Sequence, residues 1–145
     1  MKNIIIITAF SLLIIGCGAP QVDPVSTKVQ GKREETIRIF AEPPLNIDSK
    51  ISNMRSQTAG TISVLRNDLD SKGFSLNDCS LVKAYISSID EKPADRKGFL
   101  TAYKKVFGTR LVPNKPQIIL VEVLGFNNPE HLVLLEAQCH KSSQN

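Results

Sequence analysis

The chain has 145 residues, a formal net charge of +4 and 41% hydrophobic residues. This length suits one domain with a single core. The basic residues are scattered and form no tract of five or more, which argues against binding to nucleic acid. The two histidines, His131 and His140, are not at a metal-ligand spacing, so we expect neither a metal site nor a cofactor.

The N-terminus has the pattern of a bacterial lipoprotein signal peptide. Lys2 supplies a positive charge, and a largely apolar run of about twelve residues follows over Ile4–Ile15. Such a run is too short to span a membrane as a helix, which needs roughly 20 residues. Cys17 follows the small residue Gly16 and carries the thiol that the lipoprotein pathway would acylate. The alternative is that Ile4–Ile15 is a buried core segment and Cys17 an ordinary cysteine.

These patterns predict a domain organisation with a membrane anchor. We expect a signal peptide at 1–16, a lipidated cysteine and flexible tether at 17–35, a folded domain at 36–141, and a short tail at 142–145. Each buried CH₂ contributes about 0.8 kcal/mol, so stable anchoring needs more than one fatty chain on Cys17. We therefore expect the protein in the cell envelope, facing the periplasm or the exterior. The residue after the cysteine is Gly18 and not an aspartate. By resemblance to lipoprotein sorting in Gram-negative bacteria, this favours the outer membrane.

The first half of the domain predicts a strand followed by a helix. Polar and apolar residues alternate over Thr36–Ala41, and the prolines that follow would end a strand there. Residues 53–72 predict an amphipathic helix, with Gly73 placed to end it. One stripe of the helix collects the core candidates Met54, Thr58, Ile62, Leu65 and Leu69.

The second half predicts three more strands and a second helix. We expect strands at Leu81–Ile86, Ile118–Leu124 and His131–Cys139, with a helix from Pro93 to about Phe107. The order is strand, helix, strand, helix, strand, strand. Each amphipathic helix needs a sheet face to cover, which favours an α+β fold with both helices on one side.

Two cysteines, Cys79 and Cys139, remain besides the lipidation candidate. An exported protein meets an oxidising compartment, in which a disulfide can form. Their spacing of 60 residues says nothing about the distance between their Cα atoms, which decides whether a bond can form. Pairing is therefore left open by the sequence.

Five segments, spread over about residues 50–139, together resemble the Rid family, also called YjgF-like. The order and spacing of the segments carry this resemblance, since none of them is decisive alone. It implies a chorismate-mutase-like fold, in which a mixed β-sheet has two helices packed on one face. It also implies a homotrimer with a cleft between each pair of subunits. The segments are Met54–Thr58, Gly73–Asp78, Lys83–Ile86, Tyr103 with Phe107-Gly108, and Pro113–Pro116 followed by Leu132–Ala137.

The resemblance also implies an activity whose residues this chain lacks. Active Rid proteins hydrolyse enamines and imines, using an arginine for the substrate carboxylate, a glutamate that activates water, and an asparagine that lines the cleft. Ile118 stands where the arginine is expected, Leu134 where the glutamate is expected, and Leu100 where the asparagine is expected. An unpaired buried carboxylate costs about 3–5 kcal/mol, so we expect the usual imine deamination to be lost.

Two interpretations of this cleft stay open. Leu100, Ile118 and Leu134 either form a pocket for a small apolar ligand or close the cleft and add to trimer packing. Glu136 lies two residues after Leu134 and shares its face, so it is the candidate for a rearranged catalytic site. Lys115 is a second candidate from the loop. The competing interpretation is a structural or solvated Glu136 near the strand end and a Lys115 that belongs to a turn.

Two functions therefore remain from the sequence. The first is a membrane-anchored Rid-like lipoprotein that binds a ligand or a partner without catalysis. The second is a Rid-type enamine/imine deaminase, a hydrolase of 2-iminobutanoate or 2-iminopropanoate, using Glu136. An RNase-like role has also been proposed for the family. This sequence does not support it, because it shows neither a basic groove nor a histidine pair.

Overall fold

The computed structural model describes residues 34–44, 53–88 and 92–142. The predicted signal peptide and Cys17 lie outside these ranges, as do most of the predicted tether and tail. The described elements are β1 (Glu34–Ala41), α1 (Met54–Ser71), a short 3-10 helix (Leu76–Asp78), β2 (Cys79–Ser87), α2 (Arg96–Tyr103), β3 (Gln117–Val123) and β4 (Val133–Ser142). No helix in these ranges is long and apolar enough to cross a membrane.

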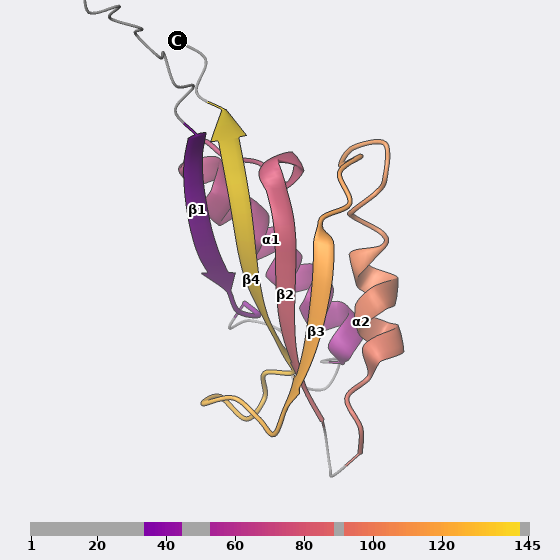
Figure 1. Cartoon of the computed structure of the whole chain (residues 1–145). Coiled ribbons are helices and arrows are strands. Elements are labelled where there is room, and N and C mark those ends of the chain that lie inside the picture. The colour runs from indigo at the N-terminus through magenta and orange to yellow at the C-terminus, as the bar shows by residue number, and fades with distance from the viewer. Residues whose placement is uncertain (1–33, 45–52, 89–91, 143–145) are drawn as a thin grey trace, which may run out of the picture. The chain divides into compact units, whose positions relative to one another are not determined.

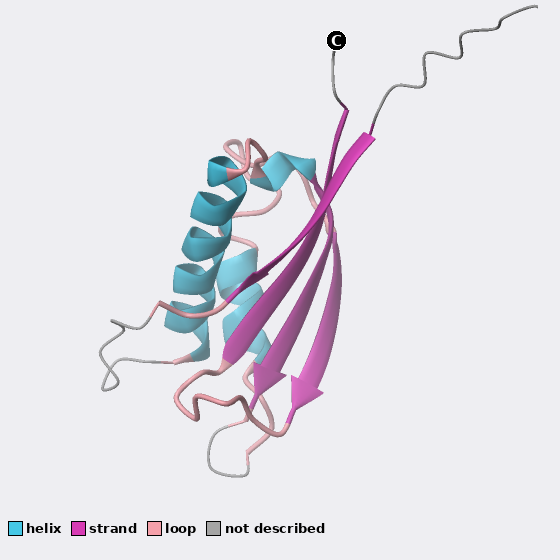
Figure 2. Cartoon of the chain, turned by 90° about the vertical axis from the view of Figure 1, so that its left-hand side faces the viewer, coloured by secondary structure: helices cyan, strands magenta, loops and turns pink. Residues whose placement is uncertain are grey.

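The four strands form one mixed sheet in the order β1-β4-β2-β3 (Figure 1). β4 is antiparallel to both β1 and β2, whereas β2 and β3 are parallel and are joined through α2. Both helices pack on the same face of the sheet (Figure 2). The structure therefore confirms the predicted α+β fold, a mixed sheet with two helices on one face.

The core lies between the sheet and α1, and the stripe predicted for this helix forms its inner side. Every stripe residue is at most 3% exposed. Thr58 and Thr61 are also buried, and each hydroxyl donates to the carbonyl four residues earlier, at 2.7 and 2.8 Å. These bonds satisfy the hydroxyls, so burial leaves no polar group unpaired.

The second helix is shorter than predicted at both ends. α2 begins at Arg96 and not at Pro93, because the Asp95 carboxylate caps it by accepting from the Gly98 N–H at 2.8 Å. Helix α2 ends at Tyr103 and not near Phe107. The N–H groups that follow make tight turns, and Gly108 then adopts a positive φ of 75°.

Within the described part of the chain, no helix covers the other side of the sheet, which we call the open face. Side chains alternate between the two faces of a strand. Ile118 and Leu120 of β3 pack against the core, so Ile119, which lies between them, and Val121, which follows Leu120, point to the open face. The open face carries the side chains of Arg38, Phe40, Lys83, Tyr85, Ile119, Val121, Leu134 and Glu136.

Candidate functional site

A nearly buried acid lies at the centre of the open face. Glu136 is 8% exposed, and it is flanked by Phe40 of β1 and Lys83 of β2. Its carboxylate accepts a hydrogen bond from the Tyr85 hydroxyl at 2.9 Å. The Lys83 Nζ lies 3.3 Å away and the Arg38 Nε 3.4 Å away. We call these four residues, Arg38, Lys83, Tyr85 and Glu136, the charged cluster.

The charged cluster keeps Glu136 ionised. Burial raises the pKa of its carboxyl, but hydrogen bonds from Tyr85 and Lys83 and the charges of Lys83 and Arg38 outweigh burial, so the pKa lies below its ordinary value. The bond to Glu136 raises the pKa of Tyr85. A general base works best with a pKa near the operating pH. A carboxylate with a lowered pKa and three partners is better suited to holding the strands together than to moving protons.

The expectation that Glu136 lies near a strand end is wrong. It is the fourth residue of the ten in β4, with strands paired on both sides. Strand alternation could have placed all four members of the charged cluster on one face. The sequence could not show that they meet, since that depends on the register between strands far apart in the chain.

The three residues predicted to line the cleft lie on different sides of the sheet in one chain. Ile118 is opposite Val82 and packs, like Leu100 of α2, against the core on the helix side. Leu134 is opposite Tyr85, on the open face, which it shares with Glu136 as expected. The structure thus brings Leu134 and Glu136 to one face and places Ile118 and Leu100 on the other. Lys115 lies in the loop before β3, with its side chain against Gly108.

Leu134 also lines a pocket at the end of the sheet where β1 ends and β4 begins. The pocket has a volume of about 570 Å³, and its other walls come from the residue after β1 and from the connection between β3 and β4. Figure 1 shows that connection at the end of the sheet where β1 ends. In it, the Glu42 Oε2 lies 3.9 Å from the His131 Nδ1, an ion pair only when the histidine is protonated. The residues that line it include Glu42, Phe126, Asn127, Asn128, His131 and Leu134. We call it the Glu42 pocket.

Gln57 fixes one wall of this pocket to helix α1. Its side-chain amide donates to the Glu130 carbonyl at 2.6 Å, and its side-chain oxygen accepts from the Leu132 N–H at 2.7 Å. Within the loop, the Asn128 side chain accepts from the Glu130 N–H and its carbonyl accepts from the His131 N–H. The residues around His131 are therefore held by the core, which favours a preformed pocket.

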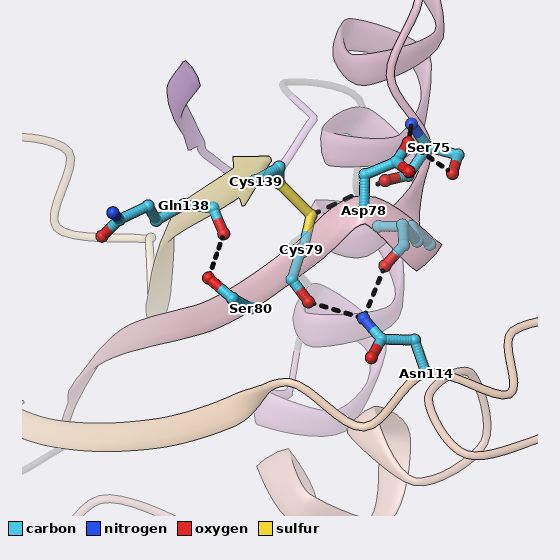
Figure 3. Close-up of a disulfide and its surroundings, with 8 residues drawn as sticks. Ser75, Asp78, Cys79, Ser80, Asn114, Gln138 and Cys139 are labelled. Carbon is cyan, nitrogen blue, oxygen red and sulfur yellow. Dashed lines mark hydrogen bonds between the residues drawn. A yellow bond between two sulfur atoms is a disulfide. The ribbon is translucent and has the colours of Figure 1, made fainter. Parts of the chain in front are cut away.

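The structure pairs the two cysteines that the sequence left open. Cys79 and Cys139 lie opposite each other in the β2–β4 pair and form a disulfide, which is at most 2% exposed (Figure 3). Asn114 supports this corner, since its amide donates to the carbonyls of Cys79 and Leu76, at 2.5 and 3.3 Å. Asn114 is part of one of the five segments that carry the family resemblance, and its contacts here are structural.

No protein-family model and no curated protein matches the sequence. Solved structures do match the fold of the chain. Rv2704 from Mycobacterium tuberculosis, of the YjgF/YER057c/UK114 family, is 18% identical with a TM-score of 0.56, covering 71% of this chain and 75% of its own. NMB1025 from Neisseria meningitidis, of the YjgF family, is 16% identical with a TM-score of 0.59, covering 75% and 82%. TdcF from E. coli is 16% identical with a TM-score of 0.59, covering 72% and 81%. The chain therefore has the fold of the YjgF/YER057c/UK114 proteins, the Rid-like fold expected from its motifs.

Proposed function

We propose that this protein is a Rid-like lipoprotein of the cell envelope that binds a small molecule without catalysing imine hydrolysis. The observation that carries the proposal is the placement of Ile118. At the position where the resemblance implies a guanidinium for the substrate carboxylate, an isoleucine packs against the core. A carboxylate bound there would lose its charged partner, at a cost of about 3–5 kcal/mol.

The charged cluster supports the same conclusion. Glu136 is the acid that the sequence offered for a rearranged site, two residues from Leu134 on the same face. Its carboxylate is already engaged by Tyr85, Lys83 and Arg38. Each of these partners lowers the pKa of Glu136, which weakens its carboxylate as a base for activating a water.

The small-molecule part of the proposal rests on the Glu42 pocket. Its volume of about 570 Å³ falls within the range of about 300–1,000 Å³ that is usual for ligand sites. Among the structural neighbours, TdcF was crystallised with bound serine. For this chain, we propose only that the same fold binds a small ligand, and not that the ligand is serine.

A deamination assay tests the proposal. We expect the full-length protein to leave the spontaneous hydrolysis rate of 2-iminobutanoate, generated in the assay from threonine by a dehydratase, unchanged. An active Rid deaminase serves as the positive control and Glu136→Gln as the matched variant. Acceleration by the wild-type chain would overturn the proposal, and its loss in Glu136→Gln would assign the catalysis to Glu136.

The enzymatic alternative keeps one observation in its favour. The Arg38 side chain is 63% exposed beside Glu136, so a guanidinium and an acid do meet on the open face. If this pair formed a rearranged site, Arg38→Met would raise KM for the imino acid more than it lowers kcat, because the guanidinium would act mainly in binding the carboxylate.

The anchor is part of the proposal and has its own test. We expect Cys17 to incorporate an alkyne-labelled fatty acid and the protein to fractionate with membranes. Cys17→Ser should remove both properties. A homotrimer, if formed, would carry three anchors and be retained far more strongly through avidity. Label retained in Cys17→Ser would contradict the assignment.

A further inference from the structure

We propose that the Glu42 pocket binds a small organic cation, an alkylammonium with a short apolar chain. The inference rests on the proposed function, because it names the ligand class of that binding module. The charged residues of the pocket favour a cation. Glu42 is the one acidic residue that lines the pocket, and neither lysine nor arginine lines it in the described part of the chain.

The carboxylate of Glu42 is placed to receive a donor. Its separation of 3.9 Å from the His131 Nδ1 is longer than a hydrogen bond, and its side chain is 63% exposed. Asn127 also lines the pocket, and its side chain contains an amide oxygen that can accept a hydrogen bond. An ammonium group carries three donors and no acceptor, which matches a carboxylate next to amide oxygens.

The rest of the pocket suits an apolar chain. Phe126 and Leu134 are the large apolar side chains among the lining residues, and Leu134 lies on the open face. Burying each CH₂ of a ligand against such walls contributes about 0.8 kcal/mol. The lining therefore selects a molecule with a cationic head near Glu42 and an aliphatic body near Leu134.

The same arrangement excludes the anions that the family resemblance implies as substrates. A carboxylate in this pocket would face the charge of Glu42 with no guanidinium to compensate. Like charges in one site repel, so anionic ligands should bind more weakly than cations of equal size and shape. Specificity would then be reversed in charge relative to active Rid proteins.

Saturation-transfer difference NMR on the full-length protein in nonionic detergent tests the charge preference. The probes are butylammonium and butanoate, which are similar in size and opposite in charge. We expect saturable transfer to butylammonium and little to butanoate. Glu42→Gln keeps the side-chain shape and should weaken butylammonium binding about three- to tenfold. The matched control is Glu35→Gln, an exposed acid of β1 outside the pocket, which should bind as the wild type does.

Three outcomes would overturn the inference. They are binding of butanoate as tight as that of butylammonium, an unchanged affinity in Glu42→Gln, and no saturable binding of butylammonium. None of these involves imine hydrolysis, so the proposed function would still stand if one occurred. Turnover in the deamination assay would instead remove the proposed function, whatever the charge preference.

Discussion

At the scale of single residues, Glu136 shows how neighbours decide what an acid does. The residue is almost buried, which alone would favour its neutral form. Two cations and a phenol hydroxyl reverse that effect and hold it as a carboxylate. The two cations differ in exposure, since the Lys83 side chain is 32% exposed and the Arg38 side chain 63%. Solvent screening makes Lys83 the stronger contributor.

Glu136→Gln should therefore lower the free energy of unfolding by about 1–3 kcal/mol at pH 7. Because the pKa of Glu136 is lowered on folding, its contribution is complete above the ordinary carboxyl pKa and is lost as pH falls through the folded value. Urea unfolding at pH 7 and below pH ~4 checks this, with Glu35→Gln as the control expected within about 0.5 kcal/mol of wild type. If Glu136→Gln lowers the free energy of unfolding by the same amount at both pH values, the charged cluster does not stabilise the fold through the charge of Glu136.

Tyr103 provides a second prediction at this scale, in the alkaline range. Burial raises its pKa to about 12, so the folded state keeps a proton that the unfolded chain releases near pH 10. Stability should fall as pH rises between these values, by up to roughly 2–3 kcal/mol from this residue. Tyr103→Phe removes the titration, and its stability should fall less steeply over that range. Parallel pH curves for the two proteins would refute this role.

The stripe of α1 and the Glu42 pocket show which groups of residues could be predicted from the sequence and which could not. The stripe of α1 was predictable because its members are three or four positions apart on one helix. The Glu42 pocket was not, because Glu42 and His131 are 89 positions apart and meet only through the pairing of β1 with β4. Leu134 was found through family resemblance, and the residues around it could not be found that way.

At the scale of elements, local sequence predicted strands well and helix ends less well. Hydrophobic periodicity located all four strands and the body of both helices. Pro93 was a plausible first residue for α2, but the Glu122 carboxylate accepts from the Ala94 N–H at 2.9 Å and holds this segment to β3. That contact joins residues 28 positions apart, so no local pattern could reveal it.

The cap of α2 gives a prediction for this element. Asp95→Ala should lower the free energy of unfolding by about 1 kcal/mol, since the Gly98 N–H loses its acceptor. Gly98 leaves room for this cap, because a Cβ there would collide with the Asp95 carboxylate. Asp70→Ala is the matched control. It lies near the C-terminus of α1, where a negative charge is unfavourable, so its removal should be neutral or slightly stabilising. Equal losses in the two variants would contradict the capping role.

For the whole molecule, the disulfide ties the first residue of β2 to β4 across 60 positions. Closing a loop of that length restricts the unfolded chain, and removing such a bond typically costs about 2–5 kcal/mol. The double variant Cys79→Ala/Cys139→Ala should lose stability by this amount in denaturant unfolding. Wild-type protein that is reduced while unfolded should refold to nearly the same lower stability. If oxidised wild type and the double variant unfold at the same midpoint, the bond is not formed in solution.

The disulfide is also relevant to the compartment in which the protein folds. The bonded cysteines are buried, so a reductant reaches them only when the domain opens. The bond is most useful to a protein that folds where thiols are oxidised, which agrees with the exported location proposed from the N-terminal pattern.

The open face carries the last prediction, because its side chains suit contact with further copies of the chain. Phe40 is 56% exposed and Ile119 is 39% exposed, on the two edge strands of the sheet. Large apolar side chains on one sheet face favour burial against another surface. We therefore expect the homotrimer that the resemblance implies. Phe40→Lys/Ile119→Lys should convert it to monomer in sedimentation analysis, because burying two cations per chain is unfavourable. Leu111→Lys, at an 86% exposed position in the loop after α2, should leave the trimer intact. A wild-type chain that sediments as a monomer, or a double variant that still assembles, would show that this face does not join subunits.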